Sequence, residues 1–252
     1  MENPCLEFTT ELYDQPTLRA LQSQFREEGF AVLPGIYQRG SVDRFFEQVK
    51  AALVNDGVEW TVPDDSPIMM WPALAPRVRQ VLPGTLSHSI AAPLPCMYMS
   101  RWLIQAPDEP DSIAAWHKDR EPDGMPGKEY HYPNDVFVGM YFEDLTPEKG
   151  PTRIIPRSHR DLSLLPNQAP HHDVLLNKED GLLLDQRTWH CGTPRQTNGF
   201  RILIVYGFYG APQHYGSCFA MPRAQQQAWI NAKTRKDVVY FGGVFLPPSG
   251  LR

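Results

Sequence analysis

The sequence predicts a mainly β protein, an antiparallel sandwich or barrel that carries two helices near its N-terminal end. The second part of the chain contains many short apolar runs bounded by Pro, Gly, Asn or Asp, the residues that commonly end strands. Proline itself is about twice as frequent as usual, with 25 residues. The first part instead shows apolar residues at helical spacing. Together these patterns favour a sheet-rich domain supported by helices.

Two helices and one short strand are expected in the first part. Apolar residues recur every three or four positions over residues 18–25, and the apolar run 30–33 is typical of a first strand. Ser41 is the expected N-cap of a second helix, whose apolar positions lie between residues 42 and 53. We expect both helices to pack on the outer face of one sheet.

From about residue 96 the pattern changes to strands. Short runs bounded by turn residues predict strands at 97–105, 114–118, 136–142, 152–155, 173–176, 181–184 and 200–208. Two long segments, 63–86 and 120–135, lack such a pattern and are expected to be irregular. The 252 residues are expected to form one domain: a helical support over about 1–95, a metal-bearing strand region over about 96–210, and a C-terminal extension, 211–252.

Composition limits the classes of partner. The formal charge is −5 and no Lys/Arg cluster exceeds two residues, so nucleic acid is not an expected partner. No apolar stretch is long enough for a bilayer, so no membrane association is expected. The first residues resemble no targeting signal, and four scattered cysteines lack metal-finger spacing, which indicates a cytoplasmic protein with reduced thiols. A small molecule is the expected substrate, and a homodimer is left open.

Three residues have the composition of a metal centre. His117 and Asp119 stand two residues apart at the end of a predicted strand, where such residues point to the same side. His190 follows the buried-strand pattern 181–184 and supplies a second imidazole. Two histidines and one carboxylate are the ligands of mononuclear non-haem iron(II) sites with open coordination positions. The residues before the two histidines, Trp116 and Trp189, are expected to point the opposite way, into the core.

Arg201 is the candidate anchor of a dicarboxylate. It stands 11 residues after His190 (201 − 190 = 11), and the turn residues between them indicate a hairpin that makes the two neighbours. A guanidinium group can bind a carboxylate in two parallel hydrogen bonds, as the distal carboxylate of an iron-chelating 2-oxoglutarate would require. Thr193 is expected to add a hydroxyl donor to this cosubstrate. Arg101 is a second candidate, for the cosubstrate or for a substrate carboxylate.

These residues resemble the phytanoyl-CoA dioxygenase family. The resemblance consists of the His117-Lys118-Asp119 segment, the stretch Gly-Pro-Thr-Arg-Ile-Ile-Pro-Arg-Ser-His at 150–159, and His190 followed by Arg201, all in the family's order. It implies a double-stranded β-helix, also called a jelly roll or cupin-like fold, with Fe(II), 2-oxoglutarate and O2 as cofactor and cosubstrates. The chain departs from the pattern at Arg157, where the family commonly has Gly. His159 is expected to be a structural residue of that turn.

The substrate is expected to be a small, largely apolar molecule, such as a natural-product intermediate. Met70, Trp71, Tyr130 and His131 lie in the two long segments and are the candidate substrate contacts. The resemblance implies hydroxylation, or desaturation, cyclisation or epoxidation, with release of succinate and CO2. Two alternatives remain: a zinc hydrolase that uses the same ligands, and an inactive jelly-roll binding module. Arg201 favours the oxygenase, because hydrolysis has no need for it.

Overall fold

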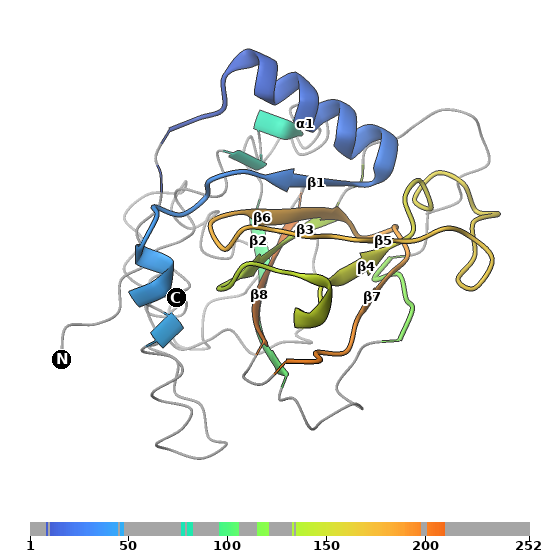
Figure 1. The fold of residues 1–252 in the computed structure, drawn as a ribbon. Helices are drawn as coiled ribbons and strands as arrows, with labels where there is room; N and C mark the ends of the chain where they lie inside the picture. The colour runs from blue at the N-terminus through green and yellow to red at the C-terminus, as the bar shows by residue number, and fades with distance from the viewer. Residues whose placement is uncertain are drawn as a thin grey trace, which may run out of the picture.

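A computed structural model of the chain contains two antiparallel sheets (Figure 1). It describes residues 9, 11–44, 46–47, 77–78, 80–82, 96–105, 115–120, 133, 135–197 and 201–209. The strands are β1 (Phe30–Leu33), β2 (Cys96–Gln105), β3 (Asp135–Tyr141), β4 (Thr152–Ile154), β5 (His172–Asp173), β6 (Gly181–Asp185), β7 (His190–Gly192) and β8 (Arg201–Tyr209). One sheet has the order β1-β6-β3-β8-β2 and the other the order β5-β4-β7. The predicted mainly β class is confirmed.

Helix α1 (Gln15–Glu28) covers the edge of the larger sheet (Figure 1). A carboxylate oxygen of Asp14 accepts from the Thr17 amide at 2.9 Å and caps the start, while Gly29, with φ 84°, ends the helix. The buried side chains are those at the predicted helical spacing, Leu18, Leu21 and Phe25, and the helix contacts β1 and β6. A short 3₁₀ helix, η2 (Pro147–Lys149), precedes β4.

The core lies between the two sheets. Every residue of β6 is buried, as expected for the apolar run 181–184 in a strand between two paired neighbours, and the terminal Asp185 is buried as well. Apolar side chains from β3, β6 and β8 meet Ile154 of β4 from the smaller sheet. Gly139 of β3 leaves the room that Leu203 of β8 fills, because a Cβ there would lie 3.2 Å from a Leu203 methyl carbon. The cluster with Ile154 joins the two sheets, whereas the fit of Leu203 beside Gly139 lies within the larger sheet.

Six predicted strands agree with the structure within one residue at each end: 30–33, 97–105, 136–142, 152–155, 181–184 and 200–208. The prediction for 114–118 was wrong for its described part, since His117 forms only an isolated bridge with His190. The prediction for 173–176 was largely wrong, because β5 ends at Asp173. Strand β7 was not predicted, since three residues are too few for a periodic signal.

The predicted hairpin before Arg201 was also wrong. Strand β7 pairs with β4 in the smaller sheet, whereas β8 lies between β3 and β2 in the larger one. The chain therefore passes from the smaller sheet to the larger one between β7 and β8. Turn residues such as Gly192 and Pro194 permit a change of direction but do not specify which strand becomes the partner.

Two local predictions in the first part of the chain need correction. Residues 41–44 and 46–47 are helical, and the first helical hydrogen bond runs from the Arg44 amide to the Gly40 carbonyl. The Ser41 hydroxyl donates to the Gln38 carbonyl instead of accepting from an amide of the helix, so Ser41 is not the N-cap. The segment 63–86, predicted to be irregular, contains helical residues at 77–78 and 80–81. The rest of that segment, most of 120–135 and the extension 211–252 lie outside the described residues. In the described part, no helix combines the length and apolar character needed to cross a membrane.

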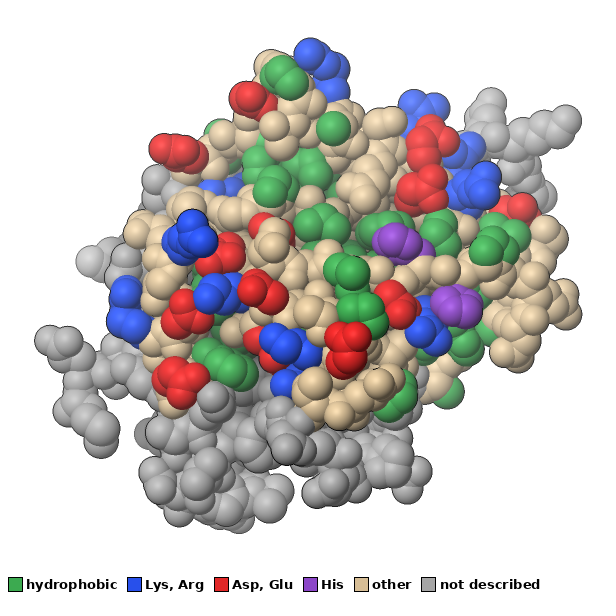
Figure 2. All heavy atoms as spheres, viewed as in Figure 1, with side chains coloured by type: hydrophobic (Ala, Val, Ile, Leu, Met, Phe, Trp, Pro, Cys, Tyr) green, Lys and Arg blue, Asp and Glu red, His purple; other side chains and the backbone are tan. Residues whose placement is uncertain are grey.

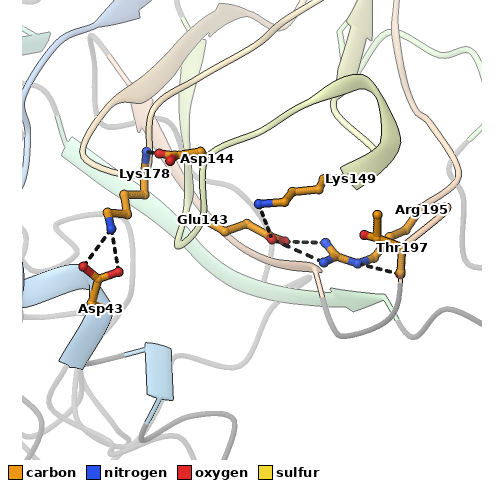
Figure 3. Close-up of polar contacts among 7 residues, drawn as sticks. All are labelled: Asp43, Glu143, Asp144, Lys149, Lys178, Arg195 and Thr197. Atoms are coloured by element: carbon orange, nitrogen blue, oxygen red, sulfur yellow. Dashed lines mark hydrogen bonds and ion pairs between the residues drawn. The ribbon is translucent and has the colours of Figure 1, made fainter.

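Acidic and basic side chains intermingle on the face seen in Figure 2. Two ion pairs, Arg195 with Glu143 and Lys178 with Asp43, differ in burial (Figure 3). Arg195 bonds the Glu143 carboxylate through both terminal nitrogens and donates from Nε to the Thr197 carbonyl at 3.1 Å. The side chains of Arg195 and Glu143 are 5% and 12% exposed. Lys178 instead meets Asp43 at 2.6 Å in a pair that is 24% and 57% exposed. The first pair thus ties the segment before β8 to the end of β3, and the second lies at the surface.

We expect Glu143→Gln to lower the free energy of unfolding by about 3 kcal/mol, because it leaves the Arg195 guanidinium buried without its counter-charge. The matched control is Asp43→Asn, which breaks the exposed pair and should cost less than about 1 kcal/mol. Urea denaturation followed by circular dichroism measures both. Equal midpoints for the two variants would show that the buried pair contributes no more than the surface one.

Candidate metal centre

Three metal-binding side chains converge from two segments of the chain. His117 and Asp119 lie in the segment 115–120, and His190 is the first residue of β7. The Nε2 atom of His117 lies 3.5 Å from one carboxylate oxygen of Asp119, and the Nε2 atom of His190 lies 3.7 Å from the other. One donor atom from each of the three residues lies within 4.8 Å of the other two, so the group could hold a metal ion.

The backbone fixes both the separation and the orientation of the two histidines. His117 and His190 exchange reciprocal amide-to-carbonyl hydrogen bonds, each of 3.0 Å, and their ring centroids lie 4.2 Å apart. Each ring also places Nδ1 against a carbonyl two residues earlier, at 2.7 Å from Ala115 and 2.9 Å from Thr188. A proton on Nδ1 satisfies these contacts and leaves the lone pair on Nε2. In the neutral form of each ring, the Nε2 lone pair is therefore directed to the side of Asp119.

The electrostatics of the three residues favour a charged carboxylate beside a neutral buried imidazole. Burial alone would raise the pKa of Asp119, but the hydrogen bond with His117 and the charges of His190, His117 and Arg120 outweigh it and hold the pKa below its usual range. Burial lowers the pKa of His190, against the pull of Asp119. The hydrogen bond to Asp119 raises the pKa of His117. An ionised carboxylate and neutral imidazoles are the forms that donate electron pairs to a metal. The shifts of Asp119 and His190 favour these forms, whereas the raised pKa of His117 favours its protonated form, which must lose a proton when a metal binds.

One side of the centre is apolar and the other is open. The His190 side chain is 8% exposed and packs edge-on against the Phe137 ring of β3 at 5.6 Å between centroids. Ile154 pairs with His190 across the smaller sheet and is fully buried. In contrast, the His117 and Asp119 side chains are 40% and 36% exposed. A metal held here would have protein on one side and accessible positions on the other.

The turn at 155–159 supports the backbone on both sides of the centre. The buried Ser158 hydroxyl donates to the Ile155 carbonyl at 2.7 Å and accepts from the Trp189 amide at 2.8 Å, directly before His190. The Lys118 ammonium donates to the Ser158 carbonyl at 2.9 Å and lies 5.3 Å from the centre of the Trp189 ring. A single serine thus links the segment of the first two ligands to that of the third.

A second supporting contact was missed in the sequence. The fully buried Asp185 carboxylate accepts from the amide and Nε of Arg187, at 3.0 and 2.9 Å, and from Nη2 at 2.7 Å. Its carbonyl accepts from the Thr188 amide at 2.9 Å, which closes the turn that leads to His190. The available signal was an aspartate directly after a run of buried apolar residues, because a buried carboxylate needs several donors.

Arg157 has a left-handed backbone, with φ 68°, in the turn where the resemblance expects glycine. The conformation costs a residue with a side chain roughly 1 kcal/mol, so we expect Arg157→Gly to raise the free energy of unfolding by about 0.5 kcal/mol after the greater freedom of an unfolded glycine is subtracted. Thermal denaturation measures the change. Arg39→Gly is the control, at an exposed arginine without a positive φ, and should lower stability. A fall in both variants would contradict the expectation.

The other sequence-predicted residues differ in how far the structure describes them. Thr193 is buried, and its hydroxyl donates to the Pro151 carbonyl at 2.7 Å, so its role as a cosubstrate donor stays a prediction. Arg201 begins β8 opposite Gln105, and Arg101 lies on β2 opposite Val205; the side chains of both arginines lie outside the description. The same holds for the four substrate candidates, Met70, Trp71, Tyr130 and His131.

The other described histidines and the tryptophans that precede the ligands differ in burial. His159 is fully buried with Nε2 3.2 Å from the Arg26 carbonyl, in keeping with a structural role, and burial lowers its pKa to about 4. His171 and His172 are exposed. Trp116 and Trp189 are only partly buried, so their prediction as core residues was wrong. Alternation sends them away from the ligand side, but that opposite side is the molecular surface rather than a second core.

Comparison with solved structures shows the fold. The chain is similar to the epimerase SnoN in complex with Fe3+, alpha ketoglutarate and nogalamycin RO (19% identity, TM-score 0.57, covering 80% of this chain and 87% of that one). It is also similar to the non-heme alpha ketoglutarate dependent carbocyclase SnoK from nogalamycin biosynthesis (18%, 0.57, 83% and 88%). A third similar structure is HygX from Streptomyces hygroscopicus with nickel and 2-oxoglutarate bound (21%, 0.53, 76% and 86%).

Sequence comparison shows the family. No curated protein matches the chain in sequence. The model of the family described as phytanoyl-CoA dioxygenase (PhyH) matches residues 25–203, which is more than two thirds of the chain and includes all three candidate ligands. The chain therefore belongs to the phytanoyl-CoA dioxygenase family.

Proposed function

We propose that this protein is an Fe(II)- and 2-oxoglutarate-dependent oxygenase that oxidises a small molecule. The observation that carries the proposal is the convergence of His117, Asp119 and His190, with both imidazole Nε2 atoms turned to the carboxylate. Family membership and the likeness to SnoN, SnoK and HygX support the same cofactor and cosubstrate. The arrangement of two facing sheets agrees with a double-stranded β-helix, which we propose as the fold.

The donor set fits a divalent iron ion. Bonds of about 2.0–2.2 Å from nitrogen and carboxylate oxygen to one ion separate neighbouring donors by roughly 3–3.5 Å. The two nitrogen-to-oxygen distances, 3.5 Å to Oδ1 and 3.7 Å to Oδ2, involve different oxygens of Asp119, and with one donor atom per residue the three atoms lie within 4.8 Å of one another. A bound ion would draw these donors closer together. Two imidazoles and one carboxylate leave open positions on the exposed side, the arrangement typical of non-haem iron oxygenases. When bound, Fe(II) with 2-oxoglutarate and O2 supplies the oxidising power, with release of succinate and CO2.

The chain's own residues would bind the metal ion, orient its ligands and shield it from water on one side. Asp119 directs one oxygen to each histidine, and the carbonyls of Ala115 and Thr188 keep both rings in the orientation that a ligand requires. Phe137 covers the buried face of His190, which excludes water from that side of the centre. These contacts hold the geometry before any substrate arrives.

Arg201 is the proposed anchor of the distal carboxylate of 2-oxoglutarate. It stands two and four positions before Leu203 and Val205, which are buried in the core between the sheets. The strand period of two predicts the same face for Arg201. A cation on the face that bounds the core needs an anionic partner, and a dicarboxylate cosubstrate would provide it. Thr193 and Arg101 remain secondary candidates.

The reaction outcome is proposed at the level of class: hydroxylation, or desaturation, cyclisation or epoxidation of a natural-product intermediate. The test is anaerobic titration with Fe(II) followed by 2-oxoglutarate, monitored for the weak visible charge-transfer band of the chelate. We expect the band to form with one equivalent of each. Absence of the band, together with hydrolysis supported by Zn2+, would favour the zinc hydrolase, and absence of any metal binding would favour an inactive binding module.

A further inference from the structure

We infer that an open groove beside the metal centre binds the hydroxylated ring of a carbohydrate, so that the substrate carries a sugar or sugar-like part; this use of the groove rests on the proposed function. The groove measures about 670 Å³, within the range of roughly 300–1,000 Å³ typical of small-molecule sites. In the described part of the chain, its lining consists of Trp116, Arg153 and the loop residues Asn167, Gln168, Ala169, Pro170 and His171.

The groove lies on the outer side of the smaller sheet, directly behind the first ligand segment. In β4 the neighbours Thr152 and Ile154 are buried towards the core, so Arg153 between them faces outwards. Trp116 precedes His117, whose side chain remains 40% exposed at the open side of the centre. Trp116, which lines the groove, is therefore adjacent in sequence to a metal ligand and lies on the opposite face of that segment, so a substrate bound at the centre would extend around this segment to reach the groove.

An aromatic ring forms one wall. The Trp116 ring is partly exposed and meets the His171 ring at 6.2 Å between centroids with 58° between planes. The two rings are inclined to each other and are not stacked in parallel. A pyranose presents C–H groups on its faces and hydroxyls around its edge. An indole face can pack against the C–H groups and leave the hydroxyls free for polar contacts.

The polar groups of the groove offer both donors and acceptors. The Asn167 and Gln168 side chains are exposed, and their amides make no hydrogen bond within the described residues. Each amide presents an NH2 donor and a carbonyl acceptor. A hydroxyl group is also donor and acceptor at once. A phosphate or carboxylate would call for donors only, and a hydrocarbon for neither.

The charge of the groove argues against an anionic ligand. Among the described residues of the lining the one arginine is Arg153, which is held by Asp173 in a two-point ion pair, from Nε to Oδ1 at 2.5 Å and from Nη2 to Oδ2 at 3.0 Å. Its positive charge is therefore already matched by a carboxylate within the protein. A neutral polyol is the ligand class that fits an aromatic wall, paired amides and a compensated arginine. This assigns polar character to a substrate that the sequence predicted as largely apolar.

The test measures carbohydrate binding and the metal centre separately. Saturation-transfer NMR with a panel of methyl pyranosides and disaccharides reports binding, and phosphate is the anionic comparison. The probe variant combines Asn167→Gly, which suits the φ of 71° at this position, with Gln168→Ala. Leu165→Ala is the matched control, because Leu165 is an exposed residue of the same loop outside the groove lining.

We expect at least one pyranoside to bind the wild type and the control equally, and to bind the double variant about tenfold or more weakly, as the loss of two amides implies. The chelate band should be the same in all three proteins. Failure of every pyranoside to bind, equal binding by the double variant, or preference for phosphate would overturn the inference while the band still supports the oxygenase. Carbohydrate binding without any chelate band would keep the groove and overturn the proposed function.

Discussion

Replacement of His190 by alanine is expected to abolish both iron binding and turnover. The variant removes one of three protein ligands, and the two that remain, His117 and Asp119, lie on one short, partly exposed segment. Metal analysis after anaerobic loading measures the first effect, and 2-oxoglutarate-dependent succinate formation measures the second. His117→Ala and Asp119→Ala should have the same result, because each also leaves two ligands.

The control for the ligand variants is His172→Ala, which removes an exposed histidine of β5 that stacks on Phe30 at 6.0 Å. It should retain iron and activity. Full iron content in any ligand variant would contradict the three-residue assignment. Loss of iron in the control as well would indicate that the substitutions act through folding rather than through coordination.

Arg201→Ala should weaken 2-oxoglutarate binding by about 2–4 kcal/mol, which is roughly 30- to 1,000-fold, because it removes one partner of a desolvated charge pair. Titration of the chelate band with 2-oxoglutarate measures the change at constant iron. The iron content should stay near that of the wild type, since no metal ligand is touched.

Arg101→Ala is the matched comparison for Arg201, because it removes the other candidate cation from the neighbouring strand β2. Its effect on 2-oxoglutarate affinity should be small. The reverse order, a large effect at Arg101 and none at Arg201, would move the anchor to β2 and leave the metal assignment intact.

The sequence predicted the elements whose signal is local. Continuous burial in β6 and the helical spacing in α1 both follow from side-chain periodicity, which does not depend on distant contacts. The approach of His117 to Asp119 follows in the same way, since only one residue separates them. The position of His190 after a buried strand also came from local pattern.

Features that depend on the choice of partner were not predictable. The isolated bridge of His117 and the short strand β7 exist because the two segments pair with each other, and neither segment shows this in its own sequence. The expected hairpin before Arg201 failed for the same reason. Trp116 was expected in the core, because hydrophobicity does not reveal that its side of the smaller sheet is left uncovered.

The reciprocal backbone pair between His117 and His190 has a consequence for the thermodynamics of metal capture. The two residues are 73 positions apart (190 − 117 = 73), and closing a flexible loop of that length would oppose binding by about 4 kcal/mol. Here the sheet closes the loop during folding, so an incoming ion meets a preorganised site and its affinity is not reduced by that entropy. A chelator should then withdraw the ion and leave the apo-protein folded.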